Sequence, residues 1–168
     1  MGGPAKQATL MAFAHRPVLA MHIRDFNVAT DLPATSALFS QLGYPVNENT
    51  LMNRFQARMN DQAVCLLVAE DHGRVVGVVA MHTLTPWHEA TRWAVISALV
   101  VDESVRGNGA GAMLLAAAEQ IAGTKGCSHV ELSSSEARLR AHAFYERAGY
   151  SEVRKRFVKR FPLQATAG

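Results

Sequence analysis

Long hydrophobic runs are absent from this sequence. The longest apolar stretch, Trp93 to Val101, is interrupted by Ser97 and followed by Asp102, whereas a membrane-spanning helix needs about 18 or more apolar residues. The first residues, Met1 to Ala14, hold one lysine and a short apolar patch, which is a poor match to a secretory signal. We therefore expect a soluble protein with no membrane partner.

Cysteine is scarce, with only Cys65 and Cys127 among 168 residues. Two thiols cannot build the disulfide framework of a small secreted domain. The cysteines and the seven histidines also lack the His-Glu-x-x-His and Cys-x-x-Cys spacings of common zinc sites, so we expect no metal. Free thiols favour a reducing compartment, and we expect the protein to be cytoplasmic.

The net charge is modest, at +3 with histidine neutral. Basic residues are concentrated near the end of the chain, at Arg154, Lys155, Arg156, Lys159 and Arg160. Such a cluster can bind nucleic acid or another anion, but no aromatic stacking platform or known reader motif accompanies it. We interpret it as a solvated strand face and expect no nucleic-acid partner.

No repeat, low-complexity block or Pro/Gly linker divides the chain. We expect one domain over residues 19–163, with tails at 1–18 and 164–168. Asp31 and Pro33 form a start signal for the first helix, and Gly73 marks a hairpin turn. The predicted strands cover residues 20–24, 64–69, 75–81, 91–101, 129–132 and 150–161, and the predicted helices cover 34–42, 48–59, 111–122 and 136–148.

This order of elements indicates an α/β (α+β) fold. Several strands joined by short connections come first, and a strand-helix-strand-helix-strand series follows. The expected architecture is a mixed, mostly antiparallel central sheet covered by helices on both faces.

A glycine-rich turn joins the strand that ends at Val101 to the next helix. Gly107, Gly109 and Gly111 let backbone amides converge on one point, and the helix N-terminus and the Arg106 guanidinium add positive charge. The turn therefore predicts a pyrophosphate site, although a tight connection without a ligand has the same pattern.

Other phosphate-binding loops fit this turn less well. The Gly-Lys-Ser/Thr of a Walker loop is missing. A dinucleotide fingerprint needs Gly-x-Gly-x-x-Gly directly after its strand, whereas the spacing here is Gly-x-Gly-x-Gly after residues 102–106. Glu131 does lie at the distance expected of a ribose-binding acid, so dinucleotide binding stays a minor alternative.

Two segments resemble the GCN5-related N-acetyltransferase (GNAT) superfamily. Arg106, Gly109 and Gly111 fill the Arg/Gln-x-x-Gly-x-Gly/Ala pattern of its motif A, and residues 144–150 resemble its Phe-Tyr-Glu-x-x-Gly-Phe/Tyr signature. Both occur in the family's order and at its usual separation. The resemblance covers about residues 19–163 and implies a single GNAT-like domain.

The resemblance also implies roles for particular residues. Backbone groups of Leu99 and Val101 are expected to bind the pantetheine arm of acetyl-CoA where the sheet splays, and Tyr145 is expected near the cofactor sulfur as a catalytic residue. The cofactor-binding residues that it implies are Leu99, Val100, Val101, Arg106, Gly107, Asn108, Gly109, Ala110, Gly111 and Ala112.

The sequence departs from the family at two positions. Arg138 stands where many members have asparagine, and Ser133 to Ser135 are an alternative source of cofactor contacts or an N-cap. Ser97 stands where some members have a glutamate base, so we expect Ser97 to hold a relay water, unless it is simply a small residue in a buried strand. Other candidate bases are Glu70, His82, His88 and Glu89.

We therefore expect an acetyl-CoA-dependent N-acetyltransferase that acts on a primary amine of a small molecule, peptide or protein by direct attack. Either the amine has a lowered pKa or it loses its proton through water. The alternative is a non-catalytic acyl-CoA-binding sensor. The sequence does not name the acceptor, and its last strand leaves a homodimer possible.

Overall fold

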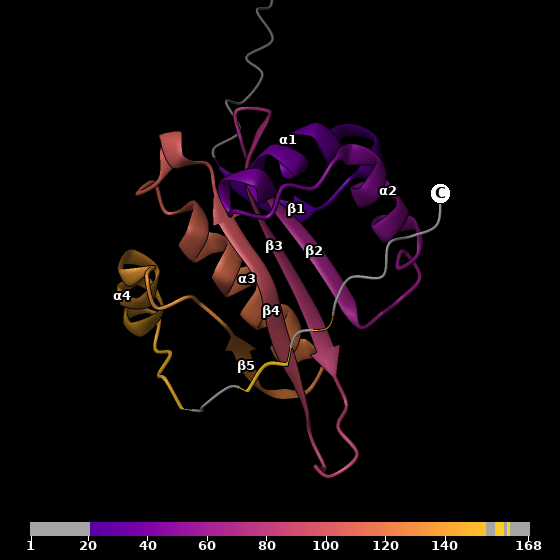
Figure 1. Cartoon of the computed structure of the whole chain (residues 1–168), viewed down its shortest axis with the longest axis vertical. Coiled ribbons are helices and arrows are strands. Elements are labelled where there is room, and N and C mark those ends of the chain that lie inside the picture. The colour runs from indigo at the N-terminus through magenta and orange to yellow at the C-terminus, as the bar shows by residue number, and fades with distance from the viewer. Residues whose placement is uncertain (1–20, 154–156, 160, 162–168) are drawn as a thin grey trace, which may run out of the picture. The chain divides into compact units, whose positions relative to one another are not determined.

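The computed structural model describes residues 21–153, 157–159 and 161, so the expected tails at 1–18 and 164–168 lie outside the described residues. Its centre is a five-stranded sheet in the order β1-β2-β3-β4-β5 (Figure 1). β1 to β4 pair antiparallel, and β5 pairs parallel to β4. The predicted mixed, mostly antiparallel sheet is therefore confirmed. The strands are β1 (His22–Asp25), β2 (Val64–Asp71), β3 (Arg74–Leu84), β4 (Arg92–Val101) and β5 (Cys127–Leu132).

The chain forms two compact units, one up to Leu132 and one from Ser133. The first holds the five strands, α1 (Val28–Gln41), α2 (Glu48–Gln56), a 3-10 turn η1 (Glu103–Val105) and α3 (Ala110–Thr124); the second holds α4 (Leu139–Arg147). No helix within the described residues is both long and apolar enough to cross a membrane.

Alternating strand residues bury both faces of the sheet in the first unit. On one face, residues of α1 and α2 pack with Val68, Val78 and Val100 in a single cluster. On the other face α3 lies close to the backbone, because a Cβ added to Gly77 would stand 2.9 Å from Leu114 Cδ1. Helices therefore cover both faces, as predicted (Figure 1).

The first helix begins earlier than predicted. Asn27 is its N-cap, with a side-chain oxygen that accepts a hydrogen bond from the Ala29 amide, and Pro33 lies inside the helix. Asp31 is no cap: its side chain is 2 % exposed and forms an ion pair with Arg24 at 2.6 Å. Burial raises the pKa of Asp31, but hydrogen bonds from Arg24, the Asn27 amide and Thr30 outweigh it, so that the pKa lies below its usual value.

The last predicted elements also differ from the structure. α4 begins at Leu139 rather than at residue 136. Within the predicted strand 150–161, the described positions 150–153, 157–159 and 161 have no strand assignment, and the other positions lie outside the described residues. The predicted closing strand is therefore wrong over the residues that the structure describes.

Candidate functional site

β4 is longer than its parallel partner. Its pairing with β5 ends where Ile96 lies opposite Leu132, the last residue of β5. β4 continues to Val101, so no described strand pairs with its last residues on that side. This stretch forms an open edge, with backbone donors and acceptors available to a ligand.

Backbone geometry selects which residues face the open edge. Val100 lies opposite Val78 on β3, and the Asp102 amide donates to the Val76 carbonyl at 2.8 Å. Because backbone groups of an antiparallel strand alternate between its two sides, those of Leu99 and Val101 point away from β3. Val100 differs from the other predicted strand residues, since its backbone faces β3 and its side chain lies in the core.

The open edge leads into the glycine turn. Gly107 and Gly109 have φ angles of +96° and +87°, and added Cβ atoms there would meet nothing within 4 Å. Only glycine adopts this conformation without strain, so the turn requires glycine at both positions. Because glycine has no side chain, the outer face of the turn is unobstructed. The exposed Arg106 folds back over it, because its Nε donates to the Val101 carbonyl at 3.2 Å.

Helix α3 starts without a cap. Asn27 and Asn47 cap α1 and α2 through their side chains, whereas the α3 N-cap, Gly109, makes no side-chain hydrogen bond. The Met113 amide donates to the Gly109 carbonyl at 3.0 Å, and among the described residues the preceding amides 109–112 have no acceptor. These N–H groups and the helix dipole favour an anion.

A carboxylate near the turn is neutralised locally. Asp102 accepts hydrogen bonds from the Ser104 hydroxyl and amide, at 2.7 and 2.9 Å, and from Arg74 at 2.7 Å. The Ser104 hydroxyl, its amide and the Arg74 charge together hold the pKa of Asp102 below its usual value. This carboxylate therefore fixes the start of η1, while the Arg74 charge limits its repulsion of a bound anion.

Ser97 is a bulge residue rather than an ordinary strand position. Ala98 lies opposite Ala80 and Ile96 lies opposite Met81, so Ser97 is an extra residue between two paired neighbours. It is exposed, and its hydroxyl donates to the Ala80 carbonyl at 3.3 Å. The alternative interpretation of Ser97, a small residue in a buried strand, is therefore wrong, and its role in holding a relay water stays a prediction.

A cavity of about 870 Å³ lies beside this bulge. Its floor includes Ala80, His82, Ser97 and Ala98, on the sheet face that α1 and α2 cover. The helix side includes Phe39, Leu42, Tyr44, Val46, Leu51, Arg54, Phe55, Arg58 and Met59. The cavity therefore has largely apolar helix-side walls and a floor of mostly small residues, and its charged lining residues are Asp25, Arg54, Arg58, Asp61 and Lys125.

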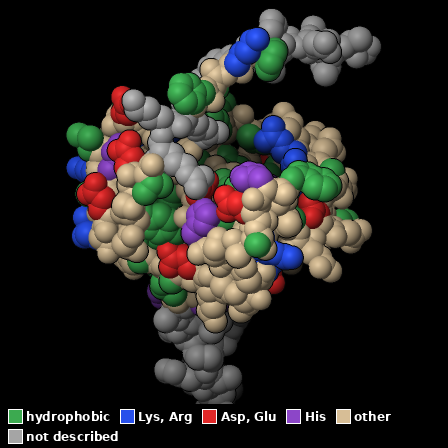
Figure 2. All heavy atoms as spheres, turned by 90° about the horizontal axis from the view of Figure 1, so that it is seen from below, with side chains coloured by type: hydrophobic (Ala, Val, Ile, Leu, Met, Phe, Trp, Pro, Cys, Tyr) green, Lys and Arg blue, Asp and Glu red, His purple; other side chains and the backbone are tan. Residues whose placement is uncertain are grey.

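The sequence analysis missed two arginines of this cavity. Arg54 and Arg58 are four residues apart, so they project from one side of α2 and its C-terminal turn, and both line the cavity. The spacing was visible in the sequence, but the direction of that side depends on how α2 packs. Figure 2 shows acidic, basic and histidine side chains interspersed on the face it draws.

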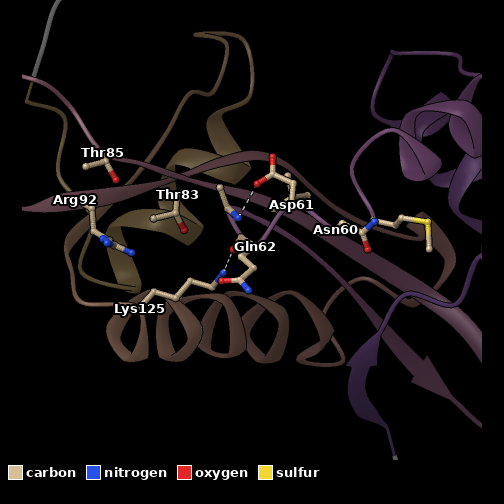
Figure 3. Close-up of a pocket in the computed structure, with 10 residues that line it drawn as sticks. Asn60, Asp61, Gln62, Thr83, Thr85, Arg92 and Lys125 are labelled. Carbon is tan, nitrogen blue, oxygen red and sulfur yellow. Dashed lines mark hydrogen bonds between the residues drawn. The ribbon is translucent and has the colours of Figure 1, made fainter.

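A second cavity, of about 720 Å³, adjoins the first at Met59, Asp61, Val64 and Lys125. Figure 3 shows Lys125 extending toward Gln62, whose carbonyl accepts its hydrogen bond. Asp61 likewise accepts from the Ala63 amide at 2.9 Å. These two charged groups therefore hold the segment between α2 and β2.

Tyr145 belongs to the second unit. Its ring packs edge-on against Phe144 and Tyr150, with centroids 5.1 and 5.9 Å away. Burial raises the pKa of the Tyr145 phenol, and the nearby Arg138 charge only partly offsets this. The phenol therefore keeps its proton at neutral pH.

The serine cluster before α4 is not an N-cap. Arg138 is the N-cap residue, and the Ser135 carbonyl accepts hydrogen bonds from the Arg138 amide and His142 Nε2. The buried Ser134 hydroxyl has no partner among the described residues.

Known proteins are similar to this chain in sequence or in fold. Aminoalkylphosphonate N-acetyltransferase of Salmonella typhimurium is 38% identical over 105 residues, which cover 62% of this chain and 68% of the relative. A GNAT family acetyltransferase of Staphylococcus aureus has a solved structure with a TM-score of 0.71, 25% identity and coverage of 85% of this chain and 100% of that chain.

An aminoglycoside N-acetyltransferase solved in complex with CoA shares the fold, with a TM-score of 0.73, 18% identity and coverage of 84% of this chain and 95% of that chain. The family model described as acetyltransferase (GNAT) family matches residues 32–150, which is more than half of the chain. The resemblance stated from the two motifs is confirmed: the chain belongs to the GNAT family of acetyltransferases.

Proposed function

We propose that this protein transfers the acetyl group of acetyl-CoA to a primary amine by direct attack of the amine on the thioester. The observation that carries the proposal is the open edge of β4, which is followed by η1, the glycine turn and the uncapped N-terminus of α3. An extended chain of amides that ends in a pyrophosphate, as CoA has, matches this order of donors.

Each part of the cofactor has a counterpart in the first unit. Backbone groups of Leu99 and Val101 are suited to the pantetheine amides. Arg106 and the amides of residues 109–112 are suited to the pyrophosphate, where each favourable helix-dipole contact contributes up to about 2 kcal/mol when partly buried. A thioester at the other end of the edge would lie near the Ser97 bulge, where the cavity opens.

The cavity favours a small acceptor that carries an anionic group besides its amine. Arg54 and Arg58 offer two guanidinium groups, which bind carboxylates, phosphates and phosphonates well. The relative at 38% identity is named for aminoalkylphosphonates, which combine these two groups. We therefore place aminoalkylphosphonates first among the acceptor candidates.

Tyr145 is proposed to assist the departure of the CoA thiolate. A protonated phenol can donate a hydrogen bond or a proton to the leaving sulfur, and the raised pKa of Tyr145 keeps it protonated. The proposed role follows from the matched motif, and it requires that α4 bring the phenol to the thioester.

The test is a panel of amines with acetyl-CoA, with free thiol release as the readout and mass spectrometry of each product. Aminoalkylphosphonates, amino acids, polyamines and lysine peptides are compared at equal concentration. We expect a product heavier by one acetyl group, with the highest rate for an anionic amine. Binding of acetyl-CoA without transfer to any amine would instead support the acyl-CoA sensor.

A further inference from the structure

The four candidate bases differ in their surroundings. Glu70 receives a hydrogen bond from Arg24 Nε at 2.7 Å. His88 Nε2 lies 3.7 Å from a carboxylate oxygen of Glu89, and both residues are exposed. Only the remaining candidate, His82, lines the cavity beside Ser97.

Strand geometry places His82 close to the bulge. Side chains two residues apart on a strand point to the same face, about 7 Å from each other, so His82 follows Ala80 on the cavity floor. Ser97 lies across from the link between Ala80 and the next residue of β3. The imidazole and the Ser97 residue therefore line the same cavity, on neighbouring strands.

The groups around His82 leave its ring nitrogens available. Its partners on the adjacent strands are Val64 and Val95, which carry no charge. In the described part of the chain no hydrogen bond to its imidazole is found. The titratable or charged groups around it are Asp25, Tyr44, Arg54, Arg58, Asp61, Cys65 and Lys125 on the cavity, and Glu131 with its partner His129 on β5 beyond Val95.

We infer that His82 accepts the proton that the acceptor ammonium loses before it attacks, an inference that rests on the proposed function. An ammonium with a pKa near 10.4 is neutral in only about one molecule in 2500 at pH 7, and a neutral imidazole is a suitable base at this pH. His82 thus supplies the general base that a serine at position 97 cannot provide.

Proton transfer to His82 comes before the attack on the thioester. The ammonium gives one proton to a ring nitrogen of His82, which becomes imidazolium, and the amine nitrogen then forms a bond to the thioester carbon. The carbon–sulfur bond breaks, and the second amine proton neutralises the thiolate. The imidazolium returns its proton to water, so that one amide, one thiol and one proton result.

The test compares His82→Gln with the control His88→Gln, an exposed histidine outside the cavity. The kcat/KM is measured against pH for primary amines whose pKa values range from about 6 to about 10. We expect His82→Gln to lose about 10²- to 10⁴-fold with the most basic amines and much less with the least basic ones. His88→Gln should match the wild type, and added imidazole should partly restore His82→Ala.

Several outcomes would overturn the role of His82. An equal loss for all amines indicates a structural effect, and full activity of His82→Gln or no rescue by imidazole excludes a proton acceptor. Calorimetric affinity for acetyl-CoA, which should not change, shows that the variant is folded. If the wild type itself acetylates no amine, the proposed function fails, and this inference fails with it.

Discussion

Gly109 is the residue at which a ligand and a side chain would compete for one space. Its φ of +87° and its open surroundings put an added side chain on the outer face of the turn. We expect Gly109→Val to weaken acetyl-CoA binding by at least 100-fold, measured by isothermal titration calorimetry.

Gly73 provides a matched control for backbone strain. It has a φ of +78°, and an added Cβ there would also meet nothing within 4 Å, but it lies in the hairpin between β2 and β3. Gly73→Val should cost similar stability, about 1 to 3 kcal/mol, and leave the affinity unchanged. Unchanged affinity in Gly109→Val would mean that the pyrophosphate binds elsewhere.

The sequence predicted single residues best where a conformation permits one residue type. The glycines at 107 and 109 were identified because a left-handed turn requires them. His82 was only one of four candidate bases, since its place on the cavity depends on the strand pairing around it. Ser97 was expected to hold a relay water, with a buried strand position as the alternative, and its bulge was missed because a bulge has no signal in a run of apolar residues.

At the scale of elements, the contact between α3 and β3 depends on a missing side chain. A Cβ at Gly77 would stand 2.9 Å from Leu114 Cδ1 and 3.1 Å from the Val100 carbonyl oxygen, and that backbone atom cannot move aside easily. We expect Gly77→Ala to lower the free energy of unfolding by about 1 to 3 kcal/mol, measured by urea denaturation.

Gly123 is the control for this substitution, because it lies inside α3 with nothing within 4 Å of an added Cβ. Gly123→Ala should raise stability by up to about 1 kcal/mol, since alanine favours the helix. Equal effects of the two substitutions would contradict the close packing of α3 on the sheet.

Sequence patterns predicted the existence of most elements but misplaced several ends. Asp31 and Pro33 have the residue types of a helix start, yet Asn27 caps the helix and Asp31 pairs with Arg24 on β1. An acidic residue near a helix start can either cap the helix or form an ion pair. The local sequence does not show which, because the partner, Arg24, lies on a strand outside the helix. The order of β5 and α4, a short strand followed by a helix, was predicted because this pair lies between Gly126 and Gly149.

At the scale of the whole molecule, a ligand that binds only the folded state stabilises all of it. Acetyl-CoA at about 100 times its Kd should add about 2.7 kcal/mol, which corresponds to a rise in Tm of roughly 5 to 10 °C for a chain of this size. Differential scanning fluorimetry measures this shift. NAD should give none, and a shift with NAD alone would support the dinucleotide alternative.

The bulge at Ser97 also explains why the even-numbered residues of β4 lie on different faces of the sheet before and after it. Before it, even-numbered residues such as Ile96 share the face of Met81; beyond it, even-numbered Val100 lies in the opposite core. A bulged strand bends and twists more strongly, and β4 leaves β5 at this point. The separation of β4 from β5 thus depends on one extra residue in β4 rather than on any particular side chain. The side chains of β4 can therefore be selected for packing.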